Sequence, residues 1–170
     1  MLSVRTIRNI AYAVEILLCF VLQGAQNIIP EIALARPVLL ICGAVTISFF
    51  EEQETAVIIA MICGLLIDIS AGMAAGPSAI VLVMLCFLFS KVFGSYFRIN
   101  VISGVLCGVA AVFALIGVMY LLECFSSDIV NTGDFFINRH LPVALYTSAL
   151  MPVFYFINKA ISGNMKKSLD

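Results

Sequence analysis

The residues with the clearest chemical potential lie in the stretch GLLIDISAGMAAGPSAI, which occupies positions 64–80 and places an acid among small residues. Asp68 stands in a row with a spacing of four, whose other members are Ala56, Ala60, Gly64, Gly72 and Gly76. Residues four apart are neighbours on a helix surface. Such a row lets two helices pack closely, and its acid can accept backbone hydrogen bonds, bind a cationic partner or relay a proton.

The other reactive residues form no recognisable catalytic or metal-binding motif. The chain has six cysteines and one histidine but no C-x-x-C pair, so no zinc or redox ligand set is apparent. Nucleophile-elbow, metalloprotease, phosphate-loop and dinucleotide-binding patterns are also absent, and no basic patch with interleaved aromatics suggests nucleic acid. We therefore expect a protein without enzymatic activity, metal or cofactor, in which the cysteines are packing residues.

The composition places these residues in a membrane. Hydrophobic residues make up 63% of the 170 residues and charged residues 11%, and the mean hydropathy is +1.15. Soluble domains have about 25% charged residues. The sequence therefore predicts a single integral membrane domain over residues 1–170, most of which faces lipid or other helices in the bilayer.

Six apolar stretches are candidates for membrane-spanning helices, each of which needs roughly 20 residues. They are predicted at about 8–29, 34–50, 55–73, 78–97, 101–123 and 140–161. None of them alternates polar and apolar residues as the strands of a membrane barrel do. The predicted fold is an all-α membrane protein, a compact bundle of six transmembrane helices.

The basic residues indicate the orientation of this bundle. With a cytoplasmic N-terminus, the inner side receives seven of the nine basic residues, namely Arg5, Arg8, Lys91, Arg98, Lys159, Lys166 and Lys167. The outer side keeps Arg36 and Arg139. Because lysine and arginine are enriched in cytoplasmic loops, the sequence predicts a multi-pass protein with both termini in the cytoplasm.

Asp68 has three possible roles. An acid at membrane depth costs about 2.5 to 3.5 kcal/mol on insertion scales and usually has a partner in the bundle. Candidate partners are Arg139, His140, the hydroxyls of Ser70 and Ser78, and freed backbone amides around 72–77. Asp68 would then pin the turn between the third and fourth helices, contribute to partner binding, or, least in keeping with the few intramembrane charges, relay protons.

A second face of small residues lies on the fifth predicted helix, where Gly104 and Gly108 form a G-x-x-x-G pair. One of the two faces could hold the bundle together while the other docks a partner's transmembrane helix. The candidate residues for helix packing or partner binding are Gly64, Asp68, Gly72, Gly76, Pro77, Gly104 and Gly108.

Two further features have open alternatives. Glu15 lies inside the first predicted helix and is expected to pair with Lys91 or with a polar neighbour such as Gln23. The long outer loop at 124–140 mixes phenylalanines with acids. It could lie at the membrane interface or cover an outward-facing cavity.

The segment GLLIDISAGMAAGPSAIVLVML, at 64–85, resembles the signature of the rod shape-determining protein MreD family. The Arg36–Pro37 pair and the closing LPVALYTSALMPVFYFI, at 141–157, are also similar to that family. The resemblance implies a non-catalytic protein of the bacterial cytoplasmic (inner) membrane. It also implies a fold similar to the six-helix substrate-binding component of energy-coupling-factor transporters.

The same resemblance implies partners. Family members bind the bitopic protein MreC and act with MreB, RodA and a class B penicillin-binding transpeptidase to direct side-wall peptidoglycan synthesis and cell shape. The alternative function is the substrate-binding component of an energy-coupling-factor vitamin transporter, with a small molecule held beneath the outer loop. The A-x-x-x-A coupling pattern expected of such a component is absent from residues 10–26.

Overall fold

The computed structural model describes residues 4–25, 36–72, 76–95, 101–126 and 136–166, and no strand occurs among them. The elements are α1 (Val4–Gly24), α2 (Leu39–Phe50), α3 (Gln53–Ala71), α4 (Pro77–Ser95), α5 (Val101–Ser126), the π-helical turn η1 (Phe136–His140) and α7 (Leu141–Lys166). The predicted all-α fold is confirmed for this part of the chain, and each of the six α-helices overlaps one predicted segment.

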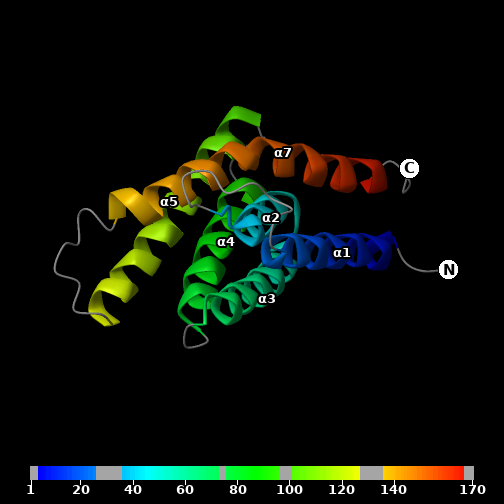
Figure 1. The fold of residues 1–170 in the computed structure, drawn as a ribbon. Helices are drawn as coiled ribbons and strands as arrows, with labels where there is room; N and C mark the ends of the chain where they lie inside the picture. Colours follow the sequence, from blue (N-terminus) through cyan, green and yellow to red (C-terminus); the bar gives the residue numbers. More distant parts are fainter. Residues whose placement is uncertain (1–3, 26–35, 73–75, 96–100, 127–135, 167–170) are drawn as a thin grey trace.

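Helix α2 forms the centre of the bundle, and Figure 1 shows the other helices around it. It packs against α1, α3, α4, α5 and α7, and every residue from Leu39 to Phe49 is buried. Its sequence, LLICGAVTISFF, has no charged residue, and a helix that is apolar on all sides is stable only when it is surrounded. Composition thus accounts for the central position of α2.

Helix α2 is shorter than predicted at its beginning. The expected segment starts at 34, whereas the helix begins at Leu39, directly after Pro37 and Val38. A residue that precedes proline is disfavoured in the helical conformation, so Arg36 cannot readily extend the helix backwards. At 12 residues and 1.5 Å per residue, α2 is roughly 18 Å long.

The two ends of the bundle differ in which helix termini they hold. The start of α1 and the end of α7 point to the same side, at the right of Figure 1, and the turn between α3 and α4 lies away from it. We call the first the terminal end, where α1 starts and α2, α4 and α7 end. The opposite end, where α1 and α3 end and α2, α4 and α7 start, is the distal end.

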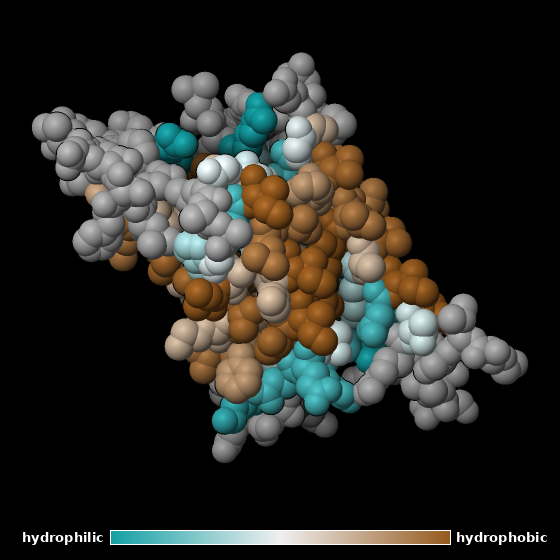
Figure 2. Space-filling model, turned by 90° about the horizontal axis from the view of Figure 1, so that it is seen from below, coloured by the Kyte–Doolittle hydropathy of each residue, from teal (hydrophilic) through white to brown (hydrophobic). Residues whose placement is uncertain are grey.

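The surface has the pattern of a membrane protein. Four helices are long and apolar enough to cross a bilayer, at Thr6–Gly24, Gln53–Ala71, Val101–Leu121 and Leu141–Gly163, and two shorter apolar helices lie at Leu39–Phe50 and Pro77–Lys91. Figure 2 shows a brown apolar band with hydrophilic residues at both of its ends. Large apolar side chains such as Ile102, Ile80 and Met84 are about two-thirds or more exposed, as expected of surfaces that face lipid.

The predicted outer loop at 124–140 is partly helical. Helix α5 continues to Ser126, and residues 136–140 form η1; residues 127–135 lie outside the described part of the chain. Tyr120 of α5 packs edge-to-face on Phe136 and on His140, at ring-centroid distances of 4.9 Å and 5.5 Å. Because such ring pairs add stabilisation beyond area burial, they fix η1 against α5 and extend the helical region into the predicted loop.

Candidate functional site

Asp68 lies at the turn between α3 and α4 and is completely buried. Its Oδ2 accepts a hydrogen bond from the Gly76 backbone N–H at 2.7 Å, and its Oδ1 accepts one from the Ser78 N–H at 3.2 Å. The first N–H groups of a helix have no partner within that helix, so the α3 carboxylate caps the start of α4. Of the candidate partners, the structure uses the backbone amides, which favours the turn-pinning role.

Gly72 and Gly76 provide the backbone conformation of this turn. Gly72 ends α3 in the left-handed conformation with φ 66°, and Gly76 has φ 136°. Glycine is the residue that adopts such angles without steric penalty. A Cβ on either glycine would meet no atom within 4 Å, so the two continue the row in sequence but not the packed face. Pro77 follows as the first residue of α4, a favoured position for proline.

Asp68→Ala should destabilise the protein by about 3 kcal/mol, because two backbone donors lose a charged acceptor in a buried turn. Asp68→Asn should cost roughly half as much, since its single carbonyl oxygen can replace one bond. The exposed Glu54 of the same helix supplies the control, Glu54→Ala. Thermal unfolding in detergent would measure all three variants, and equal melting temperatures for Asp68→Ala and the control would contradict the capping role.

The small-residue faces pack against helices of the same chain. A Cβ built on Gly64 of α3 would overlap the backbone of Ala79 in α4. On α5, the corresponding atom would lie 2.7 Å from Cε2 of Tyr155 for Gly104 and 2.6 Å from Cε of Met151 for Gly108, both on α7. The chain's own helices therefore occupy both faces, which favours helix packing over partner docking for these three glycines.

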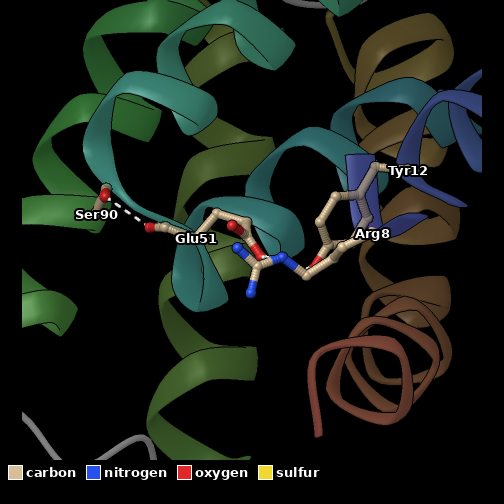
Figure 3. A network of polar contacts seen from close by, with 4 residues as sticks. All are labelled: Arg8, Tyr12, Glu51 and Ser90. Atoms are coloured by element: carbon tan, nitrogen blue, oxygen red, sulfur yellow. Dashed lines mark hydrogen bonds and ion pairs between the residues drawn. The ribbon is translucent and has the colours of Figure 1, made fainter. Parts of the chain in front are cut away.

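A polar network joins three helices at the terminal end (Figure 3). Glu51 Oε1 accepts a hydrogen bond from the Tyr12 hydroxyl at 2.9 Å and lies 2.8 Å from Arg8 Nε, with side-chain exposures of 1% for Glu51 and 15% for Arg8. The Arg8 Nε–H itself makes no hydrogen bond, so the contact with Arg8 is an ion pair without hydrogen-bond geometry. The Ser90 hydroxyl donates to the Glu51 carbonyl at 3.1 Å, which ties α4 to the end of α2.

Sequence reasoning missed this network. Glu51 falls in the acidic FFEEQET segment at 49–55, at the junction of the predicted helices 34–50 and 55–73, where no pairing was predicted. Arg8 and Tyr12 are four residues apart and therefore share a face of α1. Glu51 follows the end of α2, which runs antiparallel to α1, so it lies at the same depth as the start of α1. An acid at that depth opposite Arg8 and Tyr12 was the sequence signal that could have predicted the network.

A second polar group crosses the bundle deeper inside. The buried Asn158 Nδ2 of α7 donates to Glu15 Oε1 of α1 at 2.9 Å and to Thr46 Oγ1 of α2 at 2.9 Å. Glu15 thus pairs with a polar neighbour, as one of the two alternatives predicted, but that neighbour is Asn158, because α7 packs beside α1. Lys91 is exposed near the end of α4, and Gln23 lines a cavity at the distal end.

This distal cavity has a volume of about 650 Å³. Its lining combines apolar and cationic groups from α1, the residues before α2, α3, α5, η1 and α7: Phe20, Val21, Gln23, Gly24, Arg36, Pro37, Val38, Ile67, Ser70, Ala71, Ile116, Met119, Arg139, His140 and Val143. Of the predicted outer loop, Arg139 and His140 line this cavity, whereas residues 127–135 lie outside the described part of the chain. It has the size of a small-molecule site.

An apolar groove of about 500 Å³ runs along the outer surface of α3 and α4. We call it the α3–α4 groove; its lining residues are Met61, Leu65, Gly76, Ala79, Ile80, Val83, Met84 and Phe87. Ile80 and Met84 are 69% and 67% exposed, and no charged side chain is among the described residues that line the groove. It is therefore an apolar surface within the band that faces lipid.

The described helices do not bring together a set of side chains that could form a catalytic or metal site. No group of three or more His, Cys, Asp or Glu side chains in the described part of the chain could hold a metal ion. Cys19, Cys42, Cys63 and Cys86 are buried with free thiols. What the arrangement can do is hold helices together, present apolar faces and offer a cavity.

Comparison with known proteins identifies the family. The model of the family described as rod shape-determining protein MreD matches residues 5–160, nearly all of the 170 residues. The matched range includes the Asp68 turn, the terminal-end network and the distal cavity. Searches among curated proteins and among solved structures gave no significant match. The resemblance seen in residues 64–85 is thereby confirmed, and the chain belongs to the rod shape-determining protein MreD family.

Proposed function

We propose that the protein is a non-catalytic scaffold of the bacterial cell-elongation complex. In this proposal it binds an MreC-like bitopic membrane protein directly, acts indirectly with MreB, RodA and a class B penicillin-binding transpeptidase, and helps direct side-wall peptidoglycan synthesis. The observation that carries the proposal is the family match over residues 5–160. The absence of a catalytic motif in the sequence and the concentration of the chain in apolar helices are compatible with it.

The proposal includes a topology of six crossings in the cytoplasmic membrane, as one domain with both termini in the cytoplasm. The common side of the start of α1 and the end of α7 supports an even number of crossings (Figure 1). Arg8 lies in the first turns of α1 and Lys159 in the second half of α7, both toward the terminal end, and Arg36 and Arg139 line the cavity at the distal end. Together with the basic-residue pattern, this supports a cytoplasmic terminal end. The likeness to the energy-coupling-factor component's fold stays a prediction.

The α3–α4 groove is the surface that we assign to the single transmembrane helix of the MreC-like partner. A protein with nearly all its mass in the bilayer meets other membrane proteins through helix faces. The two faces of small residues are already covered by α4 and α7, whereas this groove is open. Ile80 is 69% exposed and so available to another helix, and the flexible Met61 and Met84 adapt to the shape of a partner.

Ile80→Trp and Met84→Trp should each reduce co-purification of the MreC-like protein at least tenfold, because a large ring would fill the groove. The controls are Ile102→Trp and Leu106→Trp on α5, whose side chains are 75% and 64% exposed and so face lipid in the same way. The measurement is quantitative mass spectrometry of the tagged protein purified from membranes in mild detergent, with expression level and melting temperature recorded for each variant.

The possible outcomes test the assignment of the groove and the scaffold function independently. Equal loss with the α5 controls would remove the assignment of the groove but leave the scaffold. Recovery of an ATPase pair with a coupling subunit, and of no wall-synthesis protein, would overturn the scaffold function in favour of the vitamin-transporter alternative, for which the comparisons give no support.

A further inference from the structure

We propose that Glu15 carries a proton in the folded protein and donates it to Oδ1 of Asn158, so that a neutral acid–amide pair joins α1 to α7 inside the bundle. The ligand of this site is a hydrogen ion, and the proposal does not depend on the scaffold function. It is carried by the orientation of the Asn158 amide, by two buried oxygens that lack a hydrogen-bond donor, and by the position of Glu15 in the apolar span of α1.

The orientation of the Asn158 amide follows from Thr46. A threonine hydroxyl has one hydrogen, and that of Thr46 is donated to the Cys42 carbonyl at 2.6 Å. Thr46 Oγ1 can therefore only accept from Asn158, so the Asn158 atom 2.9 Å away is the NH2 nitrogen. The same nitrogen donates to Glu15 Oε1 at 2.9 Å, with the Phe154 carbonyl a longer third contact at 3.2 Å. The two hydrogens of the amide thus serve Thr46 and Glu15.

Two oxygens of the same pair have no donor. Asn158 is completely buried, and neither its Oδ1 nor the buried Oε2 of Glu15 makes a hydrogen bond with the described residues. Buried polar atoms are normally hydrogen-bonded, and two acceptors cannot satisfy each other. A proton on Glu15 Oε2 satisfies both, because a protonated carboxyl group becomes a donor and can form two reciprocal hydrogen bonds with a carboxamide.

A carboxylate at this position would be a charge without a counter-charge. Glu15 is the middle residue of the apolar span Thr6–Gly24, and it forms no ion pair with the described residues. An unpaired charge inside a membrane is costly, and a buried carboxyl group takes up a proton instead of remaining charged. The neutral acid therefore suits both the hydrogen bonds and the depth.

The titratable groups around Glu15 supply no cation. Helices α2, α3 and α7 pack against α1. The Arg8–Glu51 ion pair begins seven residues before Glu15, roughly 10 Å along the helix, and Lys159 of α7 is exposed. The other titratable side chains near Glu15 are phenol and thiol groups, namely Tyr12 and Cys19 of α1, Cys42 of α2, which faces Cys19, and Cys63 of α3.

Infrared spectroscopy of the full-length protein in detergent at pH 7 would test the proposal, because a protonated carboxyl group has a C=O stretching band that carboxylates lack. We expect the parent protein to show this band and Glu15→Gln to lose it. The matched control is Glu54→Gln, which removes an exposed glutamate in the first turn of α3 and should leave the band unchanged. A parent spectrum without the band, or an equal band in Glu15→Gln, would overturn the proposal.

Isotope labelling makes the test independent of any substitution. Glutamate with ¹³C at its side-chain carboxyl carbon, incorporated into the parent protein, should move the band to lower wavenumber, because a heavier carbon lowers the stretching frequency. A band that does not move would assign the proton to an aspartate and rule out Glu15.

Melting temperatures at pH 7 would test the pairing with Asn158. Glutamine has the shape of the protonated acid, and its NH2 group can donate to Asn158 Oδ1, so Glu15→Gln should melt at the parent temperature. Glu15→Leu leaves the buried amide without this partner and should melt several degrees lower. Equal melting temperatures of the two variants would contradict the acid–amide pair.

A sodium ion is the other ligand that these oxygens could bind, because carboxylate and amide oxygens coordinate hard cations. The parent protein should therefore melt at the same temperature in NaCl and in KCl of equal concentration. A higher melting temperature in NaCl that disappears in Glu15→Gln would replace the proton by sodium and overturn the proposal.

Discussion

Gly64→Ala should destabilise the protein by about 3 kcal/mol, near the upper end of the usual range for an overpacked core. The added methyl group would overlap the backbone of Ala79, and a backbone in the first turns of α4 cannot move aside as a side-chain end can. Separation of α3 from α4 would also pull the first N–H groups of α4 away from Asp68. Bulkier residues at this position should prevent accumulation of folded protein.

Replacement of three other glycines by alanine should change the stability by different amounts. Gly104→Ala would press on the Tyr155 ring, which is buried, and Gly108→Ala on the flexible end of Met151. We expect the loss of stability to be smaller for Gly104→Ala than for Gly64→Ala, and smallest, less than about 1 kcal/mol, for Gly108→Ala, because a methionine adapts its shape. Gly43→Ala meets no atom within 4 Å and should stabilise α2 by about 0.5 to 1 kcal/mol, the usual gain in a helix.

Thermal melts with a thiol-reactive dye suit this series, because four cysteines are buried in the folded protein and become reactive on unfolding. The order of melting temperatures should be Gly43→Ala highest, then the parent protein, then the variants at Gly108, Gly104 and Gly64. A Gly64 variant as stable as the Gly108 variant would show that α3 and α4 can separate without loss, contrary to the packed turn described above.

Arg8→Leu should destabilise the protein by about 3 to 5 kcal/mol, the range for removing one partner from a buried ion pair. The Glu51 side chain is 1% exposed, so without Arg8 its charge would remain buried in the bundle. Glu51→Leu should cost less than half as much. The Arg8 side chain, at 15% exposure, can turn its charged end toward the membrane surface.

The double variant, Arg8→Leu with Glu51→Leu, gives the sharper test. Because both charges are gone, it should recover most of the stability that Arg8→Leu loses, as replacement of buried ion pairs by apolar residues often does. Lys91→Leu, which removes an exposed cation of α4, is the control for a change in basic residues alone. Additive losses in the double variant, measured by the same melts, would mean that the pair does not couple α1 to α2.

The Asp68 turn shows how far local sequence reasoning reaches. The spacing of four, the glycines and the proline made a turn-pinning acid one of three possible roles for Asp68, and the structure has Asp68 bound to the amides of Gly76 and Ser78. These hydrogen bonds join residues at most ten positions apart, which is within the reach of a local sequence pattern. The same spacing also suggested one continuous packed face, yet Gly72 and Gly76 serve the turn because their φ angles are positive, which spacing alone does not reveal.

By itself, the sequence determined the features that depend on composition and period: the apolar helices, the turn between α3 and α4, and membership of the MreD family. Only the tertiary structure decided the partners of the charged residues, since Asn158 reaches Glu15 across 143 positions and Glu51 reaches Tyr12 across 39. The physical reason is that a helical period records which residues share a face, whereas the rotation of each helix and the choice of its neighbours follow from packing of the whole bundle.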